Sequence, residues 1–178
     1  MPAEPSDALV IFGITGDLAF KKVIPALYHL ARRGRLDVPV VGVARDGSLD
    51  ALRQRVVESL AQNAGGTVDS QLREALLSRL SLVEGDYREL DTFRRLRDEL
   101  GEARRPLHYL AIPPSLFATV VEALEASGGA AGARVVVEKP LGRDLASARS
   151  LNAALGRVFR ESDLCRIDHC LGKEAVQN

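Results

Sequence analysis

Several features that mark other classes of protein are scarce or missing in these 178 residues. The only cysteines, Cys165 and Cys170, fit neither a CxxC pair nor a zinc knuckle, so we expect no disulfide framework and no metal site. The formal net charge is zero, which argues against a nucleic-acid or anionic-membrane partner. No apolar stretch approaches the roughly 18 residues of a membrane span. The N-terminus lacks the basic and apolar regions of a secretory signal. We therefore expect a cytoplasmic protein.

Composition and length indicate one globular domain covering residues 1–178. Hydrophobic residues make up 46% of the chain and charged residues 27%, which is ordinary for a folded domain. A chain longer than about 150 residues buries roughly 70% of its unfolded surface, which suffices for its own core. The glycine pairs at 65–66 and 128–129 are interpreted as loops inside this domain.

Apolar runs alternate with helical patterns along the chain. Six short, almost continuously apolar runs predict buried strands at 8–12, 38–43, 80–83, 107–112, 133–137 and 164–167. Segments with helical spacing of apolar residues lie at 17–33, 49–61, 71–79, 90–100, 115–126 and 144–156. This alternation predicts right-handed βαβ units. The expected fold class is α/β, a Rossmann-like doubly wound parallel sheet of about six strands with flanking helices.

A glycine-rich turn follows the first predicted strand. Its spacing, Gly13-x-x-Gly16-x-x-Ala19, is a relative of the G-x-G-x-x-G dinucleotide motif. Gly13 permits a tight turn, Gly16 lets a pyrophosphate approach the backbone, and Ala19 allows the helix to pack closely. The free N–H groups at the helix start would face the phosphates, and Thr15 offers a hydroxyl donor. Such a turn can also merely connect two elements, but its place between first strand and first helix favours nucleotide binding.

The end of the second strand selects between the two nicotinamide dinucleotides. An acid there binds the ribose hydroxyl of NAD, whereas an arginine suits the 2′-phosphate of NADP. Arg45 occupies this place and favours NADP, although an exposed loop cation is the plain alternative. Asp46 would repel a 2′-phosphate, so use of NAD as well stays open.

Other chemistries are less compatible with the sequence. Short-chain dehydrogenases share a similar turn but need a Tyr-x-x-x-Lys pair. Each tyrosine is followed four positions later by a different residue: Tyr28 by Arg32, Tyr87 by Asp91 and Tyr109 by Pro113. No Ser-His-Asp set, HExxH motif or P-loop lysine is evident either.

Polar segments follow the later strands, where ligands of parallel sheets bind. Lys139, one of four lysines, and Pro140 come directly after the fifth strand. Asp168, His169 and Lys173 follow the sixth strand, and a histidine with a lysine can hold a phosphate. Ser115, after the fourth strand, is interpreted as the cap of the next helix. Each segment taken alone could equally be an ordinary solvated loop.

Taken together and in order, these segments resemble the landmarks of the glucose-6-phosphate dehydrogenase family. The matching stretches are GITGDLAFKKVIPALYHL, VVGVAR, LAIPPSLF, VVVEKPLGRDL and RIDHCLGKE, and the likeness runs from Leu9 to Asn178. The family oxidises C1 of glucose 6-phosphate with NADP⁺ to 6-phosphogluconolactone, in the oxidative pentose phosphate pathway of carbohydrate metabolism. Its members are homo-oligomers that associate through a C-terminal α+β domain, which these 178 residues do not include.

The resemblance also implies roles for individual residues. The coenzyme-binding set would be Gly13, Thr15, Gly16, Asp17, Leu18, Arg45, Lys139 and Pro140. The substrate-binding set would be Lys139, His169 and Lys173. Asp168 resembles the carboxylate that pairs with the catalytic histidine and stabilises its imidazolium.

Two departures from the family pattern leave alternatives open. Cys170 stands where the family usually has a phosphate-binding tyrosine, which admits a different sugar-phosphate dehydrogenase. The catalytic histidine belongs to the C-terminal domain, whereas this chain has only His29, His108 and His169. We therefore expect NADP binding without turnover. The alternative is a stand-alone nucleotide-binding or regulatory module, or a non-catalytic homologue.

Overall fold

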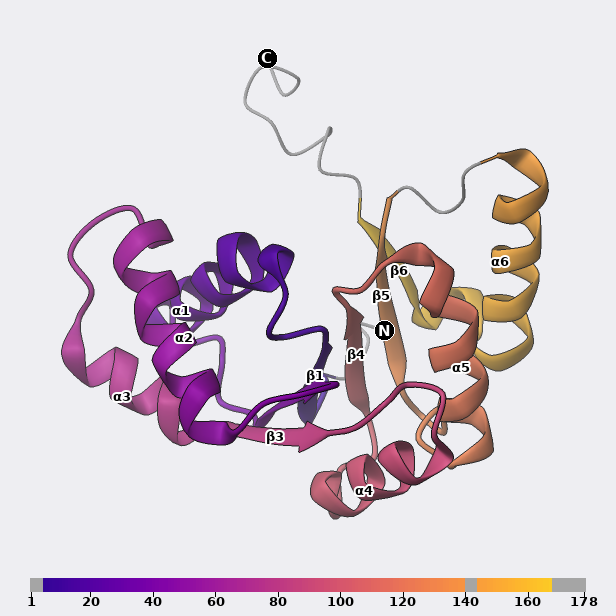
Figure 1. Cartoon of the computed structure of the whole chain (residues 1–178), viewed down its shortest axis with the longest axis horizontal. Helices are drawn as coiled ribbons and strands as arrows, with labels where there is room; N and C mark the ends of the chain where they lie inside the picture. The colour runs from indigo at the N-terminus through magenta and orange to yellow at the C-terminus, as the bar shows by residue number, and fades with distance from the viewer. Residues whose placement is uncertain (1–4, 140–143, 168–178) are drawn as a thin grey trace.

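The computed structural model describes residues 5–139 and 144–167. Within these ranges six parallel strands form one sheet in the order β3-β2-β1-β4-β5-β6. The strands are β1 (Ala8–Phe12), β2 (Val40–Ala44), β3 (Leu80–Glu84), β4 (Pro106–Leu110), β5 (Arg134–Glu138) and β6 (Leu164–Ile167). This order reverses between β1 and β4, as in a doubly wound Rossmann sheet. The predicted fold class is therefore confirmed (Figure 1).

Helices cover both faces of the sheet. The α-helices are α1 (Ile24–Arg32), α2 (Leu49–Asn63), α3 (Ser70–Ser78), α4 (Leu90–Leu100), α5 (Phe117–Ala126) and α6 (Leu145–Val158). The shorter turns are η1 (Ala19–Val23), which is π-helical, and the 3₁₀ turns η2 (Pro114–Leu116) and η3 (Glu161–Asp163). In Figure 1, α1, α2 and α3 lie to the left of the sheet and α5 and α6 to the right.

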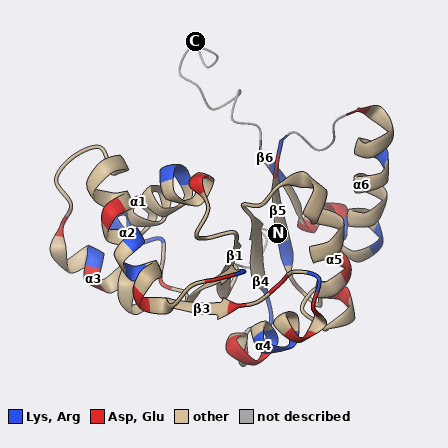
Figure 2. Ribbon diagram, viewed as in Figure 1, with Lys and Arg blue, Asp and Glu red and all other residues tan. Residues whose placement is uncertain are grey.

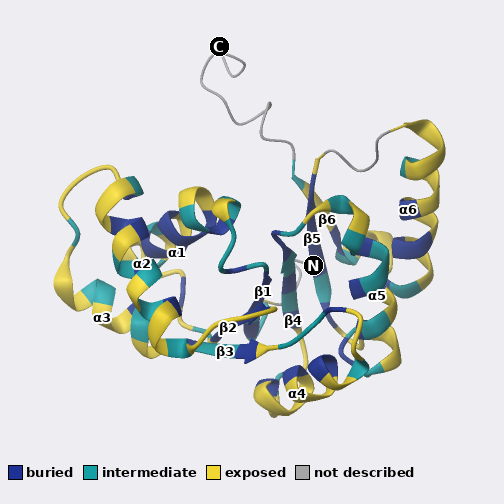
Figure 3. Ribbon diagram, viewed as in Figure 1, coloured by how far each residue is buried: buried dark blue, intermediate teal, exposed yellow. Residues whose placement is uncertain are grey.

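The alternation of side chains along each strand builds a separate core on each face. Val10 and Phe12 of β1 pack into the core that also contains Phe93 of α4 and Phe117 of α5. Ile11 points the other way, into the core formed with α1, α2 and α3. All five residues of β2 are buried, as expected for a strand covered on both faces. Figure 3 shows the same arrangement, with central strands that are largely buried between helices whose outer faces are exposed.

Side-chain caps define where several helices begin. Ser48 accepts a hydrogen bond from the N–H of Ala51 at the start of α2, at 3.2 Å. Asp144 and Ser147 form a reciprocal capping box at the start of α6. These short polar side chains satisfy N–H groups that have no partner inside the helix, so they fix the boundaries.

The first helix differs from the continuous α-helix predicted for residues 17–33. It is helical from Asp17, passes through the π-helical turn η1 and continues as α1. The N–H of Ile24 donates to the Ala19 carbonyl, and Pro25 has no N–H to donate. The carbonyl of Phe20 instead accepts a hydrogen bond from the buried Ser59 hydroxyl on α2, at 2.5 Å. The wide turn therefore depends on a residue far away in the sequence.

The interpretation of Ser115 as a helix cap is wrong. α5 begins at Phe117 with Leu116 at its N-cap, and neither η2 nor α5 has a side-chain cap. Ser115 lies inside the 3₁₀ turn, whose first residue is Pro114. Two consecutive prolines fix the backbone there, which favours the tight turn ahead of the helix.

The surface reflects the balanced charge of the sequence. Figure 2 shows acidic and basic residues interspersed along α2, α3 and α4. Within the described ranges, none of the helices combines the length and the apolar character that crossing a bilayer requires.

Candidate functional site

The turn after β1 lies where the strand order of the sheet reverses. Gly13 adopts a φ of +78°, a conformation that L side chains rarely adopt. Its N–H donates to the Val43 carbonyl of β2 at 2.9 Å. A Cβ at Gly13 would lie only 2.4 Å from the carbonyl oxygen of Ala111, just after β4. Gly13 therefore lets the ends of β1, β2 and β4 meet closely at the point where dinucleotides bind to such sheets.

Gly16 leaves open space around its own Cα. Its N–H donates to the Gly13 carbonyl at 2.9 Å, and its carbonyl accepts from Phe20 at 3.0 Å. A Cβ at Gly16 would have a single non-neighbouring atom within 4 Å among the described residues, the Gly13 oxygen at 3.1 Å. The helix begins at once with Asp17 and Leu18, and its first N–H groups have no acceptor within the helix. The turn, with the half-buried Thr15 beside it, fits a bound pyrophosphate.

Two residues that the sequence analysis did not single out hold this turn on the sheet. Ile14 is fully buried, and it packs against Gly42 in the middle of β2. A Cβ at Gly42 would come within 2.7 Å of the Ile14 side chain. Gly42 therefore makes room for the anchor of the turn. A glycine inside an otherwise apolar strand was the available sign, since it often marks such a close approach.

Arg45 lies directly after β2, exposed to solvent, with Asp46 next to it. Tyr87, which follows β3, is buried and donates its hydroxyl to the Val43 carbonyl at 3.1 Å. Burial raises the pKa of Tyr87, while the positive charge of Arg45 acts in the opposite direction. Val43 thus receives donors from both Gly13 and Tyr87, which ties the end of β2 beside Arg45 to the glycine turn.

Arg55 on α2 is a further cation at this turn. Its guanidinium lies over the ring of Phe20, 4.7 Å from the centroid, and its Nη2 is 3.8 Å from Oδ1 of Asp17. The Asp17 side chain is 87% exposed, so this ion pair contributes little to stability. Its effect is local, because the cation offsets a carboxylate that stands at the mouth of the candidate phosphate site.

Lys139 lies at the same edge of the sheet, one residue after β5. Its side chain is exposed, and its N–H donates to the Ile167 carbonyl of β6 at 3.3 Å. The preceding residue, Glu138, is buried and accepts a hydrogen bond from the hydroxyl of Tyr109 on β4. Burial and this hydrogen bond raise the pKa of Tyr109. In the sequence Tyr109 is notable only as a tyrosine without a lysine four positions later, and nothing there indicates this contact.

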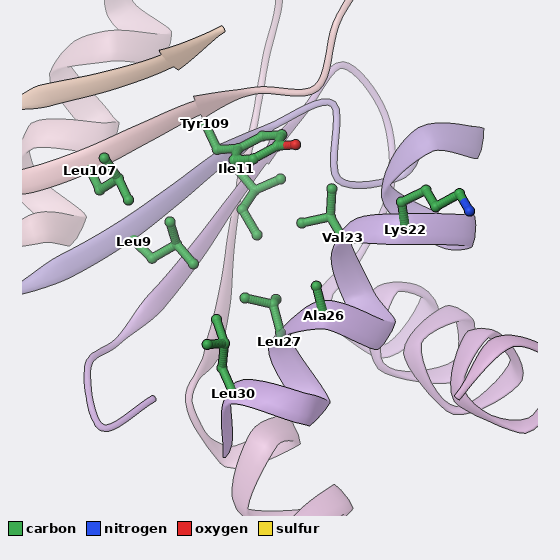
Figure 4. Close-up of a pocket in the computed structure, with 9 residues that line it drawn as sticks. All are labelled: Leu9, Ile11, Lys22, Val23, Ala26, Leu27, Leu30, Leu107 and Tyr109. Atoms are coloured by element: carbon green, nitrogen blue, oxygen red, sulfur yellow. The ribbon is translucent and has the colours of Figure 1, made fainter. Parts of the chain in front are cut away.

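An apolar groove of about 240 Å³ lies between α1 and the strands β1 and β4. Leu9, Leu27 and Leu107 are among its walls, and Lys22 and Tyr109 also line it. Figure 4 shows the Tyr109 ring directing its hydroxyl away from Leu107, toward the side where Val23 and Lys22 lie. The ring of Tyr109 therefore belongs to this groove, while its hydroxyl reaches Glu138.

Pro140, Asp168, His169 and Lys173 lie outside the described residues, as does Cys170.

His29 is half-buried on α1. His108 is fully buried in β4, where its Nε2 lies 2.9 Å from the Gly129 carbonyl. The structure thus brings Gly13, Gly16, Arg45 and Lys139 to one edge of the sheet and leaves both of these histidines away from it.

Comparison with known proteins gives consistent matches. The family model described as glucose-6-phosphate dehydrogenase, NAD binding domain, matches residues 10–178. Glucose-6-phosphate 1-dehydrogenase 1 of Mycobacterium tuberculosis is 46% identical over 173 residues, which cover 96% of this chain and 36% of that protein. The Rhizobium meliloti glucose-6-phosphate 1-dehydrogenase is 40% identical over 186 residues, covering 100% of this chain and 38% of that protein.

Solved structures agree with these relatives. The crystal structure of glucose-6-phosphate 1-dehydrogenase from Mycobacterium avium superposes with a TM-score of 0.90 at 47% identity, covering 98% of this chain and 38% of that one. A glucose-6-phosphate dehydrogenase in complex with glucose 6-phosphate gives a TM-score of 0.87 at 36% identity, covering 99% of this chain and 40% of that one. The chain therefore spans well under half the length of these glucose-6-phosphate dehydrogenases.

Proposed function

Because the chain belongs to the glucose-6-phosphate dehydrogenase family, we propose that it forms the coenzyme-binding part of an enzyme that oxidises glucose 6-phosphate. NADP⁺ would supply the hydride acceptor when bound, and the product would be 6-phosphogluconolactone. In this proposal residues 1–178 are one dinucleotide-binding domain, and an α+β domain that they do not include completes the substrate site and the homo-oligomer. The activity would belong to the oxidative pentose phosphate pathway of carbohydrate metabolism.

The observation that carries this proposal is the position of the glycine turn at the reversal point of the sheet, with Arg45 beside it. The backbone around Gly13 and Gly16, with Thr15, Asp17 and Leu18, would hold the pyrophosphate at the start of the helix. Arg45 would bind the 2′-phosphate through charge-assisted hydrogen bonds. Asp46 would weaken this preference, so NAD⁺ is the second coenzyme that we expect to bind.

The substrate side of the proposal depends on the sequence match. Lys139 would contact both coenzyme and substrate, and Pro140 would set their relative placement. His169 and Lys173 would bind the sugar phosphate, with Cys170 supplying a weaker donor than tyrosine. Asp168 would orient the catalytic histidine of the other domain and stabilise its charged form.

Residues 1–178 alone are expected to bind NADP⁺ without turning over glucose 6-phosphate. Hydride transfer needs a base at the sugar hydroxyl, and the family resemblance assigns that base, a histidine, to the C-terminal domain, with His169 as a ligand of the sugar phosphate. An assay of NADPH formation with glucose 6-phosphate checks this. A rate near that of an ordinary dehydrogenase, on the order of 10 s⁻¹, would contradict it.

Substitution of Arg45→Ala is expected to weaken NADP⁺ binding by about 10- to 100-fold and to leave NAD⁺ binding nearly unchanged. Hydrogen bonds to a charged group contribute about 1.5–3 kcal/mol, and only NADP⁺ carries the 2′-phosphate. Titration calorimetry with both coenzymes measures the two affinities.

A matched control is Arg104→Ala, which removes another exposed arginine just before β4, at the opposite edge of the sheet. We expect this variant to bind both coenzymes like the parent chain. Equal losses of NADP⁺ affinity in the two variants would show that Arg45 acts only through the general charge and is not the selector.

A further inference from the structure

The contact between Tyr109 and Glu138 joins two strands at the edge where the coenzyme is proposed to bind. Tyr109 lies on β4 and Glu138 is the last residue of β5. Glu138 is only 8% exposed, and a carboxylate removed from water to that extent requires hydrogen-bond donors. The Tyr109 hydroxyl is one such donor. The orientation of the Glu138 side chain is therefore coupled to β4.

The main chain at Lys139 is held from the opposite side as well. Its N–H donates to the Ile167 carbonyl, at the end of β6. Glu138 is thus tethered to β4 through its side chain, and Lys139 is tethered to β6 through the backbone. Lys139 itself remains exposed at the edge. This arrangement fixes the backbone beneath a solvent-facing cation.

The position of this contact differs from that of the glycine turn and Arg45. A doubly wound sheet binds a dinucleotide across its reversal point, one mononucleotide over each half. Arg45 follows β2, on the half that would receive the adenosine 2′-phosphate. Tyr109 and Glu138 lie on β4 and β5, on the half that would receive the nicotinamide nucleotide.

We propose that Tyr109 is a positioning residue that acts through Glu138 to hold the backbone of Glu138 and Lys139 against the nicotinamide half of the coenzyme. This inference rests on the proposed function. The ring of Tyr109 lines the apolar groove, so a phenylalanine would keep that packing and lose only the hydroxyl. The hydroxyl therefore contacts Glu138 at the edge of the sheet, and the ring packs in the groove beside α1.

The test compares NADP⁺ with 2′-phospho-ADP-ribose, a fragment that lacks nicotinamide, in calorimetric titrations of residues 1–178. Tyr109→Phe is expected to weaken NADP⁺ binding several-fold, up to about tenfold, because the hydrogen bond that it removes orients Glu138 and does not itself contact the coenzyme. Binding of the fragment is expected to stay within about twofold of the parent value. Glu138→Gln should show the same selectivity, and the double variant should lose less than the product of the two single effects.

Tyr87→Phe is the matched control, since it removes a tyrosine hydroxyl that donates to the end of β2. Any effect of this variant should be equal for NADP⁺ and for the fragment. Circular dichroism establishes whether each variant is folded. If Tyr109→Phe does not fold, Glu138→Gln alone tests the inference.

Three outcomes would overturn the inference. In the first, the Tyr109→Phe chain binds NADP⁺ as tightly as the parent. In the second, the variant loses affinity for NADP⁺ and for the fragment by the same factor, as a general structural role predicts. In both cases the proposed function stands, because the parent chain still binds both ligands. If the parent chain binds neither ligand, the proposed function fails and the inference fails with it.

Discussion

Replacement of Gly13 by alanine is expected to lower the free energy of unfolding by about 3 kcal/mol or more and to remove measurable coenzyme binding. The φ of +78° strains any L side chain at this position. The new Cβ would also lie 2.4 Å from the Ala111 carbonyl oxygen and 2.8 Å from Cγ2 of Ile112. The Ala111 backbone cannot move away easily, because its N–H is bonded to the Phe12 carbonyl at 3.0 Å.

Gly34→Ala separates backbone strain from this collision. Gly34 follows α1 with a φ of +64°, and a Cβ there would have nothing within 4 Å among the described residues. We expect a loss of only about 1 kcal/mol, from strain alone. Urea unfolding of both variants measures the difference. Equal losses would mean that β1 and β4 do not meet closely enough at Gly13 for a Cβ to collide with the Ala111 carbonyl oxygen.

The free energy of unfolding is expected to fall by about 3 kcal/mol between pH 7 and pH 4 because of His108 alone. His108 is fully buried, and burial lowers its pKa from 6.5 to about 4 despite its hydrogen bond to the Gly129 carbonyl. The unfolded chain therefore takes up this proton near pH 6.5, whereas the folded chain resists it until about pH 4. The free energy of unfolding is not reduced by His108 above pH 6.5. It falls as the pH drops below 6.5, and His108 causes no further loss below about pH 4.

His108→Gln isolates this effect, since glutamine can still donate to Gly129 but does not titrate. Carboxylates also destabilise the chain in acid, but they do so in both proteins and cancel in the difference. The free energy of unfolding of the parent minus that of His108→Gln should therefore fall by about 3 kcal/mol between pH 7 and pH 4. His29→Gln, a control on α1, should keep the loss of stability that His108 causes. Parallel curves for the parent and His108→Gln would contradict the buried neutral imidazole.

The fold could be predicted from the sequence because its main signals are local. Each predicted strand overlaps the observed one, since runs such as Val40–Ala44 are buried on both faces and need apolar residues throughout. The π-helical turn could not be predicted, because it follows from the missing N–H of Pro25 together with a hydroxyl on another helix, that of Ser59. The prediction that Ser115 caps the next helix was wrong for a similar reason, because the two prolines before it favour a 3₁₀ turn over its tendency to cap.

The candidate site was predictable only where a motif signals it. Gly13, Gly16 and Arg45 stand at expected spacings after strands, so parallel topology alone brings them to one edge. The contacts of Tyr109 with Glu138 and of Ile14 with Gly42 join residues about 30 positions apart. They depend on strand register, which apolar periodicity does not specify. Pro140, Asp168, His169 and Lys173 lie outside the described residues, and their roles stay predictions.

The most direct test of the central proposal is a titration of ¹⁵N-labelled residues 1–178 with NADP⁺, followed through the backbone amide signals. The proposal predicts saturable one-to-one shifts centred on Gly13 to Leu18, with Arg45 and Lys139 also perturbed. NADP⁺ that leaves these amides unchanged at millimolar concentration, or shifts centred on another surface, would contradict it.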